Sequence, residues 1–474
     1  MTQTTARARS TSATMGTFPL ARSTLAVALM AALPALAQTA TATLEPVEVV
    51  GTTPLPGTAI DRDRLPANVQ TLSGARLKEQ QESNLAELLR RHVASVNVVE
   101  TQGNPYQLEL NYRGFTASPL LGQPQGLSVY LDGVRINEPF GDIVNWNLVP
   151  RAAISGMTLM PGSNPLFGLN TLGGALVLET KSGAADPGTE LELATGSFGR
   201  REFELAHGMS LGESTNLFLA VSRHEEDGWR DYSPSEISQL YAKLDGKLGK
   251  LDWKINLMGA DSVLTGNGLL PESMAAFRRE QIYTRPDLTE HRLGAVSSQL
   301  GWDLGNGQRL SGQAYLRRLV ADTLNGDLND DYSPPDVPET GVENRSSSRQ
   351  MGYGAALQWS RQQSNVLTSA GVSYDKSRTR FRQTEAEGML DETRAVVDAE
   401  DEELSAYIRG YSRTTSVWAE QVQSLAPGLD LSLSARYNRT KVTTVDVGRQ
   451  LGLDTTLDAA DTYAKLNPGI GLTW

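Results

Sequence analysis

The chain has 474 residues, of which 39% are hydrophobic and 6% aromatic, with no cysteine and a formal net charge of -12. The lack of thiols excludes disulfides and cysteine-ligated metals, and the negative charge argues against a nucleic-acid-binding protein. A mean hydropathy of -0.32 is too low for a helical membrane protein.

Residues 1–37 have the pattern of a secretory signal peptide. Basic residues precede an apolar stretch from Leu25 to Leu36, and Ala35-Leu36-Ala37 offers a small-residue cleavage site. A single membrane anchor is the rival interpretation, but the stretch is short and small polar residues follow it. We therefore expect cleavage after Ala37 and export from the cytoplasm.

Residues 38–60 are expected to form a flexible segment around one β-prone motif, Val47, Glu48, Val49 and Val50. Proline and glycine follow the motif, and no pairing strand is visible nearby. From the residues alone a disordered linker is the simpler interpretation. The alternative is an exposed extended peptide that adds itself to the edge of a partner's sheet.

Residues 61–183 are expected to fold as a small α+β domain. Asn84 is placed to cap a helix whose residues Leu85, Leu88, Leu89 and Val93 share one face. Strand-like runs joined by glycine-rich turns follow, at 96–100, 107–112, 127–131, 156–160 and 175–180.

From residue 189 to residue 474 apolar and polar residues alternate in segments of about ten residues, which is typical of a transmembrane antiparallel β-barrel. About twelve strands are expected, near 190–196, 201–210, 215–223, 239–247, 251–260, 291–304, 308–317, 351–360, 365–376, 414–423, 429–439 and 462–474. A soluble β-sandwich also alternates. Brief turns and long links strictly alternate here, however, so the two rims differ as they do in outer-membrane barrels.

Several motifs resemble the plug and the start of the barrel of TonB-dependent outer-membrane receptors. Val47-Glu48-Val49-Val50 resembles the TonB box, and the last plug motif closes on Thr180-Lys181. The other matching motifs are residues 84–99, 112–115, 129–135, 159–163, 165–168 and 173–181. The resemblance covers most of the chain after the signal peptide, strongly in the plug and more loosely in the barrel.

This resemblance implies an active importer of the outer membrane. The implied partners are TonB with its inner-membrane motor proteins, outer-membrane lipid and lipopolysaccharide, and a small-molecule ligand. No cofactor is implied. An iron–siderophore complex is the expected cargo, with cobalamin, another metal or a glycan as alternatives. A signalling transducer would need a further periplasmic domain, and a passive porin would need neither plug nor box. No phosphate loop and no H-E-x-x-H motif is present, so no enzyme is expected.

The resemblance also suggests roles for individual residues. The TonB contacts would be Val47, Glu48, Val49 and Val50. If the family layout holds, the plug loops 101–106 and 137–146 face the ligand through Gln102, Asn104, Tyr106, Asn137, Glu138, Phe140, Asp142, Asn145 and Trp146. A structural or plug-to-wall role is expected for Arg113, Gly114, Asp132, Gly133, Gly168, Gly173, Gly174 and Lys181. No metal site is expected, because the calcium-like run at 327–331 lacks the glycine and the glutamate that such a loop needs.

The expected strand number conflicts with the expected plug. Barrels that hold a plug have about twenty-two strands, and a domain of about 130 residues is too wide for the lumen of a twelve-stranded barrel. A truncated product of a longer gene is the preferred interpretation, and its open sheet would lack the heat-modifiable gel mobility of a closed barrel. Against it, Ile470, Leu472 and Trp474 alternate up to a terminal aromatic residue, as in many complete barrels.

Overall fold

The computed structural model describes residues 48–79 and 84–474. The expected signal peptide, its cleavage site after Ala37 and the first residue of the box, Val47, lie outside the described residues. Everything described below belongs to one compact unit, Val47–Trp474.

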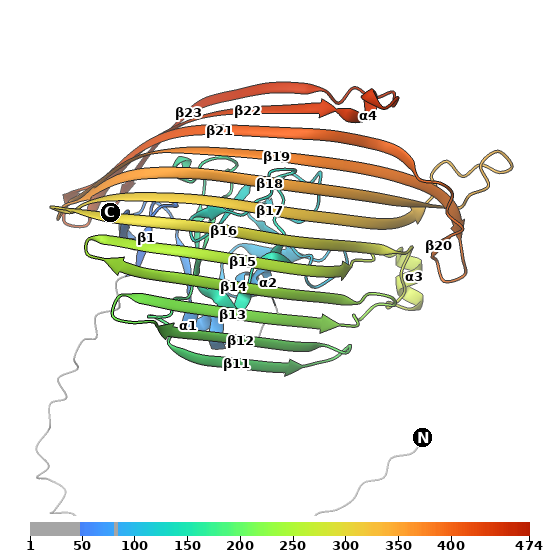
Figure 1. The fold of residues 1–474 in the computed structure, drawn as a ribbon, viewed down its shortest axis with the longest axis horizontal. Helices are drawn as coiled ribbons and strands as arrows, with labels where there is room; N and C mark the ends of the chain where they lie inside the picture. Colours follow the sequence, from blue (N-terminus) through green and yellow to red (C-terminus); the bar gives the residue numbers. More distant parts are fainter. Residues whose placement is uncertain (1–47, 80–83) are drawn as a thin grey trace, which may run out of the picture. The chain divides into compact units, whose positions relative to one another are not determined.

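A large antiparallel sheet forms the second part of this unit (Figure 1). It has 13 strands, and all of them except β20, which pairs only with β19, follow one another in chain order. Their bounds are β11 Gly188–Thr195, β12 Arg201–Ser210, β13 Thr215–Glu226, β14 Ser235–Leu248, β15 Leu251–Thr265, β16 Asp287–Gly305, β17 Gln308–Leu328, β18 Gly341–Gln362, β19 Val366–Leu390, β20 Val396–Val397, β21 Glu403–Ala426, β22 Leu429–Asp446 and β23 Ala459–Thr473. The expected fold class is therefore confirmed.

The two faces of this sheet have opposite character. On β14, Leu240 is 52% exposed whereas its neighbours Tyr241 and Lys243 are 1% and 2% exposed. The same inversion holds on β21, where Val417 is exposed and Ser416 is buried. Apolar side chains on the outside and polar ones inside are what a wall between lipid and a wet lumen requires.

The two rims differ as predicted, but the strands are longer than predicted. Two-residue turns at 249–250, 306–307 and 427–428 define a short-turn rim, and loops such as 266–286 and 391–402 define a long-loop rim. The long links predicted after the strands near 308–317 and 365–376 are wrong over most of their length, because β17, β18, β19 and β21 continue through them. Polar residues occupy both faces of these extensions, so no alternation reveals them.

The plug contains two further sheets and two helices. One sheet has the order β3-β9-β10-β7-β8, and the other the order β4-β5-β6. The strands are β3 Gln70–Ser73, β4 Val96–Val99, β5 Glu109–Tyr112, β6 Phe115–Ala117, β7 Leu127–Leu131, β8 Val134–Arg135, β9 Ile154–Pro161 and β10 Gly174–Thr180, and the helices are α1 Gly74–Glu79 and α2 Leu85–His92. Four short 3-10 helices lie between them: η1 Arg62–Arg64, η2 Trp146–Leu148, η3 Arg151–Ala153 and η4 Pro165–Phe167.

Helix α2 begins and packs as predicted. The Asn84 side chain accepts a hydrogen bond from the amide of Glu87 at 2.8 Å, which satisfies one of the unpaired donors at the helix start. Leu85, Leu88 and Leu89 are buried and join the main apolar core of the plug, together with Leu127, Val129 and Leu176 of its larger sheet. This core is built from plug residues, and Met258 of β15 packs against it from the wall.

The segment before the plug has a pairing strand, contrary to the sequence-based expectation. β1 (Val49–Gly51) pairs antiparallel with β2 (Ala59–Asp61), with Val50 opposite Ile60. Pairs of three-residue strands leave almost no pattern in a sequence, so the partner could not be predicted. Among the described residues β1 pairs with β2 alone, and its other edge is unpaired.

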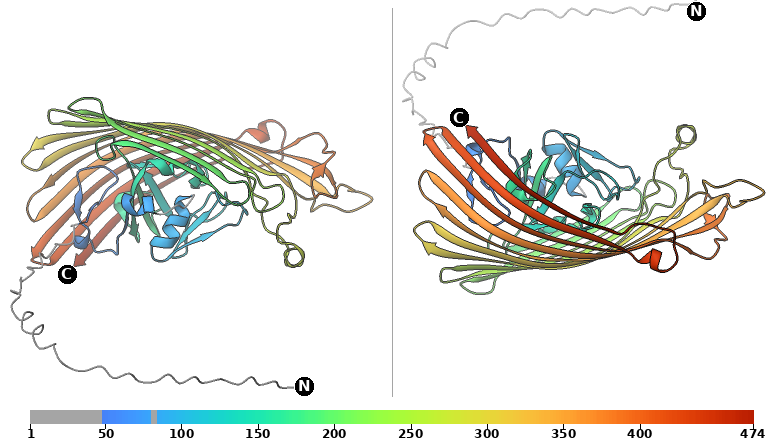
Figure 2. Two further views of the ribbon diagram at one scale, coloured as in Figure 1. Left: turned by 90° about the horizontal axis from the view of Figure 1, so that it is seen from below. Right: turned by 90° about the horizontal axis from the view of Figure 1, so that it is seen from above.

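The plug lies against the concave face of the large sheet (Figure 2). Within residues 48–79 and 84–474, no pairing joins β11 to β23, so the sheet is open between these two strands. No helix of the described residues is long and apolar enough to cross a membrane.

Candidate functional site

A cavity of about 400 Å³ separates the plug from the wall formed by β17, β18, β19, β21 and β22. This volume is within the usual range for small-molecule sites. Its lining is mixed, with charged, aromatic and small polar groups from both sides. On the plug side these include Tyr130, Arg135 and Asp142, and on the wall side Tyr315, Asp375 and Arg436.

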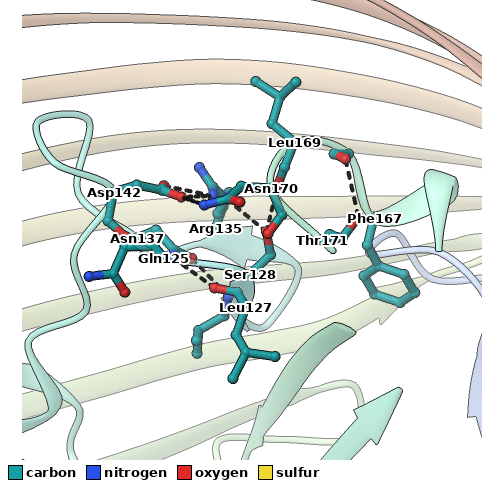
Figure 3. A network of polar contacts seen from close by, with 12 residues as sticks. Gln125, Leu127, Ser128, Arg135, Asn137, Asp142, Phe167, Leu169, Asn170 and Thr171 are labelled. Atoms are coloured by element: carbon teal, nitrogen blue, oxygen red, sulfur yellow. Dashed lines mark hydrogen bonds and ion pairs between the residues drawn. The ribbon is translucent and has the colours of Figure 1, made fainter. Parts of the chain in front are cut away.

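A polar network fixes the plug side of the cavity (Figure 3). Arg135 lies 2.7 Å from Asp142, and Asn170 also donates to the Asp142 carboxylate. Ser128 donates to the carbonyl of Leu169 at 2.7 Å and accepts a bond from Arg135 at 3.3 Å. Burial acts to lower the pKa of Arg135, but Asp142 together with Tyr130 and Tyr315 raises that pKa above its usual value. The network ties the loops 137–146 and 168–171 into one surface.

The loop at 137–146 also reaches the wall. Glu138 is 1% exposed and lies 2.6 Å from Arg317 of β17. The amide of Phe140 donates to Gln350 of β18 at 3.0 Å, and its ring lies 5.2 Å from the ring of Phe381. These contacts close one end of the cavity.

The wall contributes one buried cation without an acidic partner. Arg436 lies over the Trp418 ring at 4.8 Å, and it donates to the Leu166 carbonyl at 3.0 Å. Within the part of the chain that the structure describes, no carboxylate lies within salt-bridge distance of Arg436, and Asp375 instead accepts from the Tyr315 hydroxyl at 2.9 Å. Arg436 therefore has no direct ion pair, although Asp375 lines the same cavity, and a cation in this position favours anionic ligands.

The second expected ligand loop, 101–106, lies at the long-loop rim. Asn104 is buried and donates to Ser235 at 2.7 Å and to the carbonyl of Thr265 at 2.8 Å, at the outer ends of β14 and β15. The Tyr106 ring lies 6.4 Å from that of His224. Burial raises the pKa of the Tyr106 phenol. Gln102 is half-buried beside this rim and accepts a bond from the amide of Gly268.

Two of the expected ligand residues have their polar groups engaged inside the plug. Asn137 accepts from the amide of Val129 at 2.8 Å and donates to the carbonyls of Leu127 and Asp142. Trp146 donates to the Ala117 carbonyl at 3.0 Å and is buried. The structure thus places Asn137, Glu138 and Asp142 in the lining of the cavity and Phe140 against Gln350 and Phe381 of the wall, with Gln102, Asn104 and Tyr106 in a separate group.

Asp132 is the central residue between plug and wall. With Gly133 it forms the two-residue turn between β7 and β8, and both have positive φ, 44° and 79°. Its carboxylate lies 3.1 Å from Lys243 and accepts from Tyr241 at 3.2 Å. A Cβ on Gly133 would lie 2.5 Å from the carbonyl oxygen of Pro54, so the turn needs glycine for space as well as for its φ.

The other residues to which a structural role was assigned divide into two groups. Lys181 lies 3.2 Å from Glu190 of β11 and is buried. Gly114, Gly168, Gly173 and Gly174 lie in turns or at strand ends of the plug, and all but Gly173 have positive φ. Arg113 departs from the expectation: it is exposed, lies over the Tyr112 ring at 5.0 Å and makes no ion pair among the described residues.

Some plug-to-wall residues were missed by the sequence analysis. Arg151 binds Glu204 of β12 at 2.9 Å and Glu192 of β11 at 3.2 Å. Gln239 of β14 donates to the carbonyl of Asn147 at 2.7 Å. The only available signal was polar residues on the inward face of predicted strands, and it does not identify their partners.

One motif of catalytic type was also missed. Residues 208–212 have the G-x-S-x-G spacing of a serine nucleophile, which needs a sharp strand-to-helix turn. Ser210 instead ends β12 in a strand-to-strand turn, is exposed and donates to Asn216 at 3.0 Å. No group of three or more metal-binding side chains occurs among residues 48–79 and 84–474.

Comparisons with known proteins agree with this geometry. Residues 61–175 match the family model "TonB-dependent Receptor Plug Domain". The vitamin B12 transporter BtuB of Vibrio cholerae is 24% identical over 164 residues, which is 34% of this chain and 26% of the relative. The chain therefore matches about a quarter of that relative's length.

Solved structures show the same fold. The unliganded ferric citrate transporter FecA superposes with a TM-score of 0.68 and 13% identity, covering 86% of this chain and 60% of that one. The ferripyoverdine receptor of Pseudomonas aeruginosa superposes with a TM-score of 0.69 and 14% identity, covering 90% and 57%. Residues 61–175 are thus similar to the plug domain of TonB-dependent receptors, and the plug together with the large sheet has the fold of solved receptors of this kind.

Proposed function

We propose that this receptor moves a scarce anionic ligand, with an iron–siderophore complex as the favoured cargo, across the outer membrane by using energy that TonB transmits. The observation that carries the proposal is the cavity between plug and wall, where the buried cation Arg436 lacks an acidic partner. Ferric chelates are often anionic, and the solved structures that share the fold include a ferric citrate transporter.

The coupling to TonB is proposed from the other end of the plug. Val49 is 62% exposed, and β1 has an unpaired edge on which a partner's strand could add. Arg64, a few residues further on, lies 2.9 Å from Asp430 at the start of β22, which is at the short-turn rim. In outer-membrane barrels that rim faces the periplasm, where TonB acts. Cleavage of the signal peptide after Ala37 belongs to the same proposal.

A cysteine introduced at one position tests the coupling, because the natural chain has none. Val49→Cys should form a disulfide with a cysteine-scanned TonB fragment, whereas Leu248→Cys, which is even more exposed at the same rim, should not. Equal cross-linking of both variants, or of neither, would contradict the proposed contact.

Cargo is tested by the quenching of tryptophan fluorescence in the refolded chain. We expect saturable quenching by an anionic ferric chelate, and at least tenfold weaker binding after Arg436→Gln. Arg292→Gln, which removes an exposed cation from β16, is the matched control. Cobalamin is the second candidate because the curated relative is a vitamin B12 transporter; binding of cobalamin without any ferric chelate would replace the favoured cargo.

A further inference from the structure

Most of the charged side chains that line the cavity between plug and wall form direct ion pairs. Arg135 lies 2.7 Å from Asp142, and Arg317 lies 2.6 Å from Glu138. Lys376 also borders the cavity, but it is exposed, and strand alternation points it to the outer face of β19. Burying a charge is costly unless an opposite charge and hydrogen bonds accompany it, and the two ion pairs meet that requirement.

Two charged residues of the wall, Asp375 and Arg436, line the same cavity without such a pair. The Asp375 carboxylate accepts a hydrogen bond from the Tyr315 hydroxyl at 2.9 Å. Arg436 is buried and donates to the side chain of Asn438 at 2.8 Å and to the carbonyl of Leu166 at 3.0 Å. These partners are neutral, and among the described residues neither charge makes an ion pair. We call Asp375 and Arg436 the divided pair.

Ser373 shows how far apart the two charges of the divided pair lie. The Arg436 guanidinium is 3.5 Å from the Ser373 hydroxyl. Ser373 and Asp375 are next but one on β19, so they share its inward face at a spacing of about 7 Å. Two hydrogen bonds of about 3 Å each fill most of such a gap. A ligand that contacts both groups must therefore carry its two charges within a few bonds of each other.

Two further features of the wall suit this part of the cavity to a polar ligand. Ser416 of β21 lies opposite Ser373, lines the cavity and is 1% exposed, yet its hydroxyl has no hydrogen-bond partner among the described residues. A buried polar atom without a partner costs free energy, which a polar group of a ligand would recover. The Trp418 ring lies 4.8 Å from the guanidinium of Arg436 and supports it from one face.

We propose that the divided pair binds an α-amino-acid group of the cargo, with its carboxylate on Arg436 and its ammonium on Asp375. A ligand with the carboxylate alone would bring its charge close to Asp375, and a ligand with the amine alone would bring its charge close to Arg436. Like charges at such a distance oppose binding, whereas a zwitterion compensates both residues. This inference rests on the proposed function, because it names the part of the cargo that the cavity holds.

L-leucine and two analogues that each lack one charge test this chemistry. Isocaproate keeps the carboxylate of leucine without the ammonium, and isoamylamine keeps the ammonium without the carboxylate. Binding of each probe to the full chain, refolded in a non-ionic detergent, is measured by saturation-transfer difference NMR. We expect saturable binding of leucine and at least tenfold weaker binding of each analogue.

Substitutions separate recognition of the ammonium from a merely structural role. Asp375→Asn should weaken leucine binding at least tenfold but strengthen isocaproate binding, because the anion close to Arg436 is gone. Asp261→Asn removes the same charge from an exposed residue of β15 and should change leucine binding less than twofold. Ser416→Ala should weaken leucine binding roughly two- to tenfold without lowering the melting temperature, because its hydroxyl has no hydrogen bond to lose.

Equal binding of leucine and isocaproate by the natural chain would overturn the proposal, and so would an equal loss of both probes in Asp375→Asn. If that variant does not fold, the three probes on the natural chain and Ser416→Ala still decide. The anionic ferric chelate separates this inference from the proposed function. Binding of the chelate without binding of leucine would overturn the amino-acid site alone, whereas binding of leucine without the chelate would support the site and overturn the favoured cargo.

Discussion

The ion pair between Glu138 and Arg317 should control how tightly the plug loop 137–146 is held to the wall. Their side chains are 1% and 11% exposed, and the two charged atoms lie 2.6 Å apart. Arg317→Met would leave the carboxylate buried with only a bond from Asn145 at 3.5 Å. Removing one partner of a buried pair costs about 3–5 kcal/mol, and we take about 3 kcal/mol because this weak bond remains.

Hydrogen exchange measures this effect where it acts. The amides of Glu138 and Val144 donate to the carbonyls of Ile143 and Ser118, so both should be protected. A loss of about 3 kcal/mol makes local opening roughly a hundredfold more frequent, and exchange should accelerate equally. Adding Glu138→Gln to the variant should recover much of the protection, because it removes the unpaired charge.

A matched substitution at an exposed pair gives the comparison. Arg292 and Asp261 lie 3.5 Å apart, with side chains 72% and 63% exposed. Arg292→Met should therefore change stability by less than about 1 kcal/mol. If Arg317→Met left hydrogen exchange in the loop 137–146 unchanged, or changed it no more than Arg292→Met does, the Glu138–Arg317 pair would not hold this loop to the wall.

The remaining predictions concern the plug and the open sheet. Gly133→Ala should lower the free energy of unfolding by about 3 kcal/mol, because the residue has a positive φ and a Cβ would meet the carbonyl of Pro54. Gly162 has a similar φ but open space around it, so Gly162→Ala should lower the free energy of unfolding by only about 1–2 kcal/mol. Urea titration measures both changes. Asn84→Ala should cost about 1 kcal/mol in the same assay through loss of the α2 cap. Because no pairing joins β11 to β23 among the described residues, the 474-residue chain should show no heat-modifiable mobility on gels, and a folded band that shifts on boiling would contradict this.

The barrel strands could be predicted because their signal is local. The alternation of Leu240 with Tyr241 and Lys243 reports directly on the two environments of the wall. The signal fades where the strands leave the lipid, as at Arg378 and Arg380, because both faces are then polar. The predicted ends were therefore those of the membrane-spanning part and not those of the strands.

The plug-to-wall contacts could not be predicted, although several residues that make them could. Asp132 stood out as a charged residue beside an apolar strand, but its partner Lys243 is far along the chain and belongs to another sheet. The sequence does not show which inward polar residue of the wall will contact a given polar residue of the plug. The strand register and the position of the plug against the wall bring Asp132 and Lys243 together.

The contacts of the segment after the box indicate how a pull from the periplasm would travel, on the proposed function. Leu55 packs with Leu166 of the plug and Trp418 of the wall, and the hydroxyl of Thr52 donates to Glu420 of the wall at 2.7 Å. A force along β1 meets these contacts and the short ribbon with β2 before it reaches the main core of the plug, which is separate. Polar bonds hold much of this segment, including those of Thr53 to Gln358 and of Ser311 to the Pro56 carbonyl, and water can replace them at little net free energy. The buried side chains of Val50, Leu55 and Ile60 add apolar contacts that a pull must also break. The segment can therefore leave the wall while the core stays folded, and the cavity that borders Leu55 would widen first.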